Sequence, residues 1–193
     1  MQESSGTSCS NTATGSASVL VNPLPTATIA GNNTVCQNSS SPQIIFTGNG
    51  GTQPYTFSYK INGGAVQTVN TTTGNSVAVN VPTGSAGTFI YTLVSVQESS
   101  GTSCSNAASG NATVVVNPVP LANIAGSTTV CQNSSAPSIT FTGSGATPPY
   151  TFTYKINGAT SQTVTTISGN SVIVSVPVTA AGTFVYTLQS VKE

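Results

Sequence analysis

The sequence predicts an all-β protein made of tandem immunoglobulin-like antiparallel β-sandwich domains, with about seven strands in each 95-residue repeat. Three observations lead to this prediction. Short runs of alternating apolar and polar residues recur along the chain, Gly, Pro, Asn and Ser separate the runs, and the whole pattern returns at a fixed offset. No stretch of useful length shows the period of an amphipathic helix.

The clearest run is PYTFSYKING at residues 54–63, which recurs as PYTFTYKING at 149–158. Its aromatic and aliphatic side chains alternate with Thr, Ser and Lys, so one face of the strand is apolar and the other polar. We expect the apolar face in the core and Lys60 and Lys155 in water. The Asn-Gly pair that follows favours a hairpin turn. We predict that this segment is the central strand of its sheet.

The remaining strands of a complete unit are predicted from the same alternation and from the turn residues between them. The first is a kinked strand that runs across Gly31, Asn32 and Asn33. The predicted segments are 26–30 with 34–36, 43–47, 55–61, 66–70, 76–81, 88–96 and 112–116.

Internal repetition sets the domain organisation. QESSGTSCSN at 2–11 returns at 97–106, TVCQNSS at 34–40 returns at 129–135, and AGTF at 86–89 returns at 181–184, always at an offset of 95. This period is too long for a solenoid repeat and fits a whole sandwich domain. Proline-containing connectors at 21–27 and 116–122 favour stiff spacers between domains.

These connectors divide the chain into three predicted parts. Residues 1–24 are the last strand of a preceding immunoglobulin-like repeat, and 25–119 form one complete repeat. Residues 120–193 are a following repeat that lacks its last strand.

The composition excludes several classes of function. Only 3% of the residues are charged and the formal net charge is zero, so a basic nucleic-acid-binding surface is not available. No run of 18 apolar residues provides a membrane span in this segment. Without His or Asp the usual catalytic triad cannot be assembled, and the three glutamates lie a full repeat apart. We expect no enzymatic activity, no cofactor and no metal site.

Several stretches together resemble the repeats of giant cell-surface adhesins of gliding, flavobacteria-type bacteria. They are TVCQNSSSPQIIFTG, PYTFSYKINGG, GTFIYTLVSVQESSGTSCSN and VVVNPVP. The resemblance covers essentially the whole chain and occurs twice. It implies export through the outer membrane by the type IX secretion system, a link to gliding motility, and display as long extracellular filaments attached to that membrane. It supplies no catalytic residue.

The four cysteines give one pair per period. With no His and no CxxC spacing, zinc binding is not expected, and the extracellular setting favours disulfides. We predict a Cys36–Cys104 bridge within one domain, with Cys9 and Cys131 pairing with neighbouring repeats. The alternatives are Cys9–Cys36 with Cys104–Cys131, which would cross each connector, and four free thiols.

The favoured function is that of a structural stalk repeat of a surface adhesin, which projects a distal binding tip and bears mechanical load. The alternative is a glycan- or cell-binding immunoglobulin-like module that acts through its loops. The expected partners are adjacent identical repeats of the same fibre, and a surface polysaccharide at the distal tip. The spare strand in 1–24 matches the strand missing from 120–193, so we also expect head-to-tail strand donation.

Overall fold

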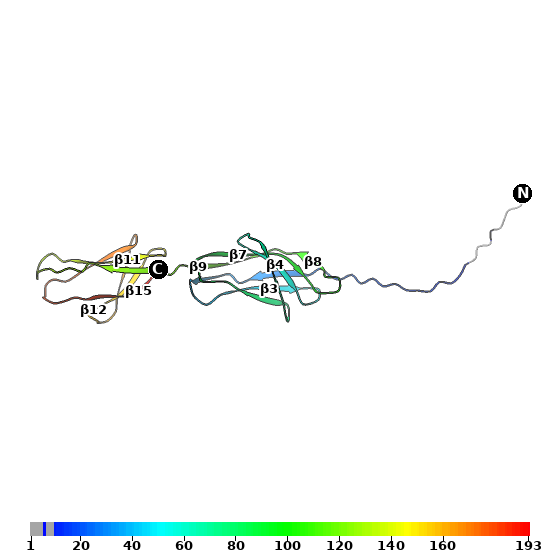
Figure 1. Ribbon diagram of the computed structural model, residues 1–193, viewed down its shortest axis with the longest axis horizontal. Coiled ribbons are helices and arrows are strands. Elements are labelled where there is room, and N and C mark those ends of the chain that lie inside the picture. Colours follow the sequence, from blue (N-terminus) through cyan, green and yellow to red (C-terminus); the bar gives the residue numbers. More distant parts are fainter. Residues whose placement is uncertain (1–5, 7–9) are drawn as a thin grey trace.

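The computed structural model describes residue 6 and residues 10–193. Figure 1 shows two β-sandwiches placed end to end, with an extended tail leaving the first sandwich on the side away from the second. The described part of the chain contains strands and no helices, so the all-β prediction is confirmed.

The first sandwich contains nine strands, whose alternating burial agrees with the alternating sequence. They are β1 (Thr26–Ala30), β2 (Asn33–Cys36), β3 (Gln43–Asn49), β4 (Thr56–Ile61), β5 (Val66–Asn70), β6 (Ser76–Asn80), β7 (Gly87–Gln97), β8 (Ser105–Ala107) and β9 (Asn111–Asn117).

Two sheets face each other in this sandwich. One has the order β1-β3-β6, and the other has the order β2-β9-β7-β4-β5 with β8 also pairing with β7. All pairings are antiparallel except that of β2 with β9, which is parallel. The adjacency of β9, β7 and β4 supports the immunoglobulin-like assignment, which stays a prediction.

Two turns explain how the chain changes direction. Asn62 and Gly63 both have positive φ, at 49° and 71°, which closes the β4–β5 hairpin as the Asn-Gly pair predicts. Gly31 has φ 124°, and a Cβ there would lie 2.3 Å from the carbonyl oxygen of Gln43. Gly31 therefore allows the chain to leave β1 in one sheet and begin β2 in the other.

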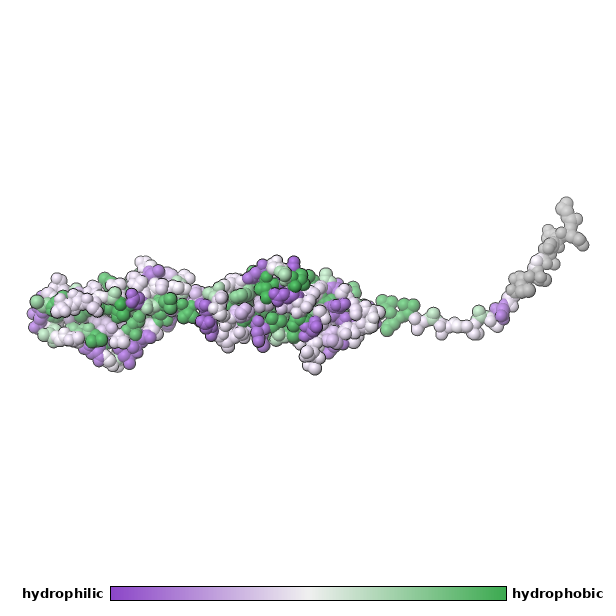
Figure 2. Space-filling view, viewed as in Figure 1, coloured by the Kyte–Doolittle hydropathy of each residue, from purple (hydrophilic) through white to green (hydrophobic). Residues whose placement is uncertain are grey.

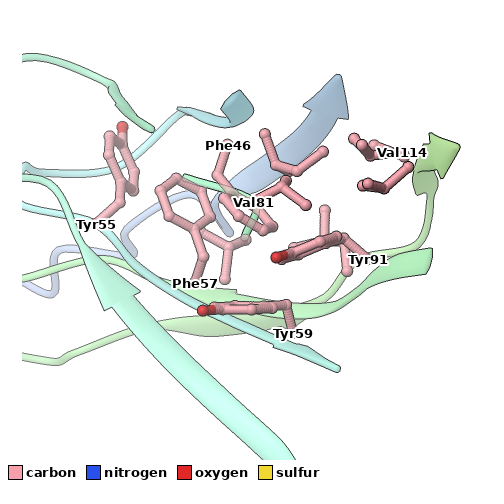
Figure 3. Packing of buried hydrophobic residues seen from close by; sticks show 12 residues of the cluster. Phe46, Tyr55, Phe57, Tyr59, Val81, Tyr91 and Val114 are labelled. Atoms are coloured by element: carbon pink, nitrogen blue, oxygen red, sulfur yellow. The ribbon is translucent and has the colours of Figure 1, made fainter. Parts of the chain in front are cut away.

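Aromatic rings from the two sheets form the core of the first sandwich (Figure 3). Phe46 on β3 lies 5.7 Å from Phe57 and 5.0 Å from Tyr59, measured between ring centroids, and both partners are on β4. Tyr59 stacks in turn on Tyr91 of β7 at 5.9 Å. Val114 of β9 is fully buried beside this group. The predicted aromatic face of residues 54–63 thus joins the two sheets.

Three expectations about the strands need correction. The segment after Pro54 is an interior strand but not the central one, because β7 occupies the middle of the sheet. The predicted kinked strand is two strands in different sheets, since Gly31 turns the chain between them. Strand β8 was not predicted, because its three residues are too few to show alternation.

The second sandwich repeats this arrangement with fewer strands. They are β10 (Leu121–Ala125), β11 (Ser138–Ser144), β12 (Thr151–Ile156), β13 (Gln162–Thr165), β14 (Ser171–Ser175) and β15 (Tyr186–Lys192). The sheets have the orders β10-β11-β14 and β13-β12-β15. Within the described residues, neither β2 nor β9 has a counterpart strand here.

Burial in the second sandwich is correspondingly incomplete. Phe141, Tyr150, Phe152 and Tyr154 are buried, like their counterparts in the first sandwich. Five further positions of the hydrophobic core are buried in the first sandwich, but only partly buried in the second. These second-sandwich positions are Ile139, Val176, Tyr186, Leu188 and Val191.

Candidate functional site

The chain enters and leaves the first sandwich at opposite ends. Pro25 is buried beside Asn106, whose side-chain amide donates to the Pro25 carbonyl at 3.0 Å, close to where β7 ends. Asn117 ends β9 beside the start of β7, because Gly87 pairs with Val116. The 11 residues of β7 therefore separate the two connectors by about 35 Å. A pull on the connectors acts along the long axis of the sheet.

Strands β2 and β9 lie side by side along that axis, and we call this pair the β2–β9 clamp. They are parallel, with Asn33 opposite Val114 and Cys36 opposite Asn117. The backbone amide of Gln37 then donates to the carbonyl oxygen of Asn117 at 2.7 Å. Tension on the two connectors draws parallel neighbours past each other, so the hydrogen bonds between them share the load rather than opening one at a time.

The end of the sandwich where the chain enters is organised by one carboxylate. Glu98, only 2% exposed, accepts hydrogen bonds from the backbone amides of Thr52 (3.0 Å), Ser100 (2.8 Å) and Cys104 (2.9 Å). The Ser100 hydroxyl donates a fourth. A single acidic side chain thus satisfies three loop amides and fixes the 99–104 loop.

This environment shifts the ionisation of Glu98. The Ser100 hydroxyl and then the amides of Thr52, Cys104 and Ser100 lower the pKa of the carboxyl group from 4.5 to about 2, against the opposing effect of burial. One glutamate recurs in each 95-residue repeat, but this spacing alone does not predict the role of Glu98. The Ser-rich loop directly after the acid is the signal that could have indicated it.

We expect Glu98→Gln to abolish an acid-dependent part of the stability of the first sandwich. Because the folded-state pKa is lowered, the carboxylate stabilises the fold above about pH 4.5, and this contribution disappears as the pH falls toward 2. Urea unfolding from pH 7 to pH 2 should show a steep loss for the natural chain and a flatter, lower curve for the variant.

The control for this experiment is Glu193→Gln, at the same position of the next repeat. Glu193 is exposed, and the hydrogen bond found for its side chain is one from the amide of Thr147 at 3.1 Å. Its substitution should leave the pH dependence unchanged. An equal effect of the two substitutions would contradict the role given to Glu98.

The loop fixed by Glu98 also holds the N-terminal connector. The side-chain amide of Asn22 donates to the hydroxyl of Thr102 at 2.9 Å and to that of Ser100 at 3.3 Å. Together with the Asn106 contact to Pro25, these bonds fix the point at which the tail leaves the first sandwich. These contacts restrict rotation of the tail about its junction with the first sandwich.

The structure does not form the predicted Cys36–Cys104 disulfide. Both thiols are free, and they lie at opposite ends of β7, with Cys36 beside Asn117 and Cys104 beside Glu98. Cys131 is also free and is exposed in the second sandwich. Cys9 lies outside the described residues, so pairing of Cys9 and Cys131 with neighbouring repeats stays a prediction.

A groove of about 570 Å³ opens along the second sandwich where the first sandwich holds β9. One wall is formed by residues 127–132, the counterpart of β2, and the other by residues 180–186, the counterpart of the start of β7. Apart from Tyr186, which begins β15, the residues of the two walls form no strand.

None of the described residues form a group of three or more His, Cys, Asp or Glu side chains that could hold a metal ion. No helix in the described part is long and apolar enough to cross a membrane. All twelve aromatic residues of the chain are buried or partly buried, so none forms an exposed stacking platform for a sugar.

Comparison with known proteins gives limited similarity. No family model matches the chain, and no curated protein matches it. Among solved structures, one similar chain is from a 1.5-MDa bacterial ice-binding adhesin studied for host cell surface retention (14% identity, TM-score 0.37, 82% of this chain and 56% of that chain).

A second similar chain is a Ca²⁺-stabilised adhesin that helps an Antarctic bacterium reach out and bind ice (16% identity, TM-score 0.40, 86% of this chain and 48% of that chain). A third is the BSP domain of a biofilm-associated protein (16% identity, TM-score 0.28, 88% of this chain and 27% of that chain). The chain therefore spans about half or less of these proteins, and its solved neighbours are bacterial adhesin domains.

Proposed function

We propose that this chain is a stalk segment of a bacterial cell-surface adhesin, made of tandem sandwich repeats that transmit load and project a distal binding tip. The observation that carries the proposal is the position of the connectors at opposite ends of the sandwich, with the parallel β2–β9 clamp between them. The resemblance of the sequence to gliding adhesin repeats supports the cell-surface setting. Type IX secretion and attachment to the outer membrane belong to the same proposal.

Low charge suits this role. With 3% charged residues and a net charge of zero, neighbouring sandwiches repel one another little, and salt changes their spacing little. The Asn22 contacts hold the first sandwich at a fixed angle to its N-terminal connector, which helps a row of such domains to stay in line.

Single-molecule force spectroscopy tests the clamp. The first sandwich should unfold at a higher force than the second, in which the counterparts of β2 and β9 are not paired. Val35→Pro should lower the unfolding force of the first sandwich to roughly half. The amides of alternate residues face β9, so the substitution removes one of the two donors at positions 35 and 37.

The control is Val35→Ala, which trims the same side chain but keeps the backbone amide. It should lower thermal stability while leaving the unfolding force nearly unchanged. Equal unfolding forces for the two sandwiches, or no effect of Val35→Pro, would contradict the clamp. Reproducible binding of the chain on a glycan array would instead favour the loop-binding module.

A further inference from the structure

We infer that the groove on the second sandwich binds the N-terminal tail of another copy of this chain, so that copies join head to tail by strand donation. The donor is the segment 16–22, SASVLVN, and the acceptor is the pair of walls at 127–132 and 180–186. This assembly is inferred for the 193-residue chain by itself and does not depend on the adhesin proposal.

The donor has the sequence of the strand that the groove lacks. Segment 16–22 aligns at the offset of 95 with β9, ASVLV corresponding to ATVVV. In β9, Ala112, Val114 and Val116 point into the core and are at most 2% exposed. In the tail, Val19 is 88% exposed and Val21 is 84% exposed. Hydrophobic atoms of the tail next to the first sandwich are uncovered in Figure 2.

The acceptor has the side chains that such a strand would cover. Tyr186 and Leu188 are partly buried, whereas their counterparts Tyr91 and Leu93, which β9 helps to cover, are at most 2% exposed. Val130 is 45% exposed, and its counterpart Val35 packs on the core. The walls thus carry the same residues as the walls around β9, without the strand between them.

The register of the complex follows from that of β9. The donor should lie antiparallel to residues 182–187. Val19 would then be opposite Phe184 and Val21 opposite Gly182, as Val114 faces Phe89 and Val116 faces Gly87. The donor should lie parallel to residues 128–131, with Asn22 opposite Cys131, as Asn117 faces Cys36.

Geometry makes the donation intermolecular. The donor ends three residues before Pro25, which is buried in the first sandwich, so the intervening chain reaches about 10 Å. The groove lies beyond the far end of that sandwich, and the tail points away from it (Figure 1). A donor at one end and an acceptor at the other make a heterologous contact, which builds open chains rather than closed dimers.

The junction formed in this way matches the one already present within the chain. Asn-Pro-Leu-Pro at 22–25 would join the donated strand to the next sandwich, as Asn-Pro-Val-Pro at 117–120 joins β9 to the second sandwich. The Asn22 contacts to Ser100 and Thr102 hold the donor at a fixed exit point. Each added copy therefore continues the same repeat.

Analytical ultracentrifugation of the natural chain tests the inference, in reducing buffer so that the thiols form no crosslinks. Between about 1 and 500 μM we expect a concentration-dependent ladder of species that differ by 19.2 kDa. The double substitution Val19→Asp and Val21→Asp should weaken association by about 100-fold or more, because two carboxylates would replace the two valines that enter the groove and would be buried without a partner.

Leu20→Asp is the matched control. Leu20 is as exposed as Val21 in the free tail but corresponds to Val115, which points away from the core, so this variant should still form the ladder. A synthetic peptide of residues 12–25 should bind the doubly substituted chain and protect the 182–187 amides from hydrogen exchange. A natural chain that stays monomeric at 500 μM, or a ladder that survives the double substitution, would overturn the inference.

Discussion

We expect Val114→Asp to unfold the first sandwich at moderate temperature while leaving the second folded. Val114 is fully buried between Phe89 and the aromatic core, so the substitution removes apolar contact and places an unpaired carboxylate there. A cost of about 4 kcal/mol is a large part of the stability of a small domain and corresponds to a fall of about 20 °C in Tm.

Differential scanning calorimetry should therefore show the transition of the first sandwich moving far down in temperature. The control is Val19→Asp, the same change at the same position of the preceding repeat. Because Val19 is 88% exposed in the free chain, it should not change either transition in dilute solution. Similar shifts for the two variants would mean that the tail is already packed on a sandwich.

The second large effect concerns completion of the second sandwich. Adding the sequence of residues 99–117 after Glu193 would supply the loop and the strand that follow Glu98 in the first repeat. The added strand should fill the groove and bury Tyr186, Leu188 and Val191. A net gain of about 3 kcal/mol, close to the burial of one large apolar side chain, would raise the Tm of this sandwich by about 15 °C.

A matched extension that carries Asp in place of both inward-facing valines of the added strand should give no such gain. The natural extension should also prevent head-to-tail association, since the groove would already be occupied in each copy. An unchanged Tm with the natural extension would contradict the proposed domain limits of 25–119 and 120–193.

The strands of the first sandwich were largely predictable because each has one face in the core. Alternation in 43–47, 55–61, 76–81 and 88–96 matches β3, β4, β6 and β7 closely. Short-range patterning says nothing about which sheet a strand joins. The separation of β1 from β2 at Gly31 and the central place of β7 therefore required the three-dimensional structure.

The features that position the candidate site were harder to predict. Glu98 accepts hydrogen bonds from the amide of Thr52, which is 46 residues away in the sequence, and from the amide of Cys104, which is 6 residues away. Any residue type can supply a backbone amide, so the sequence does not reveal these partners. The Cys36–Cys104 pairing failed in this structure because one pair per repeat does not say at which end of the sheet each thiol lies. The repeat offset predicts domain limits of 25–119 and 120–193, and these limits stay a prediction.

Hydrogen exchange measured by mass spectrometry tests the central claim most directly, that the two sandwiches are the same unit with and without its last strand. The comparison is between residues 87–89 and 182–184 in the chain carrying Val19→Asp and Val21→Asp, kept dilute and monomeric. Ile90 and Val185 are left out because their amides donate equally to the side chains of Asn62 and Asn157, at 2.8 Å and 2.7 Å. We predict slow exchange within 87–89, where β7 pairs with β9, and fast exchange within 182–184, which form no strand. Equal protection of the two segments would contradict the account, because the groove would then already be closed within a single chain.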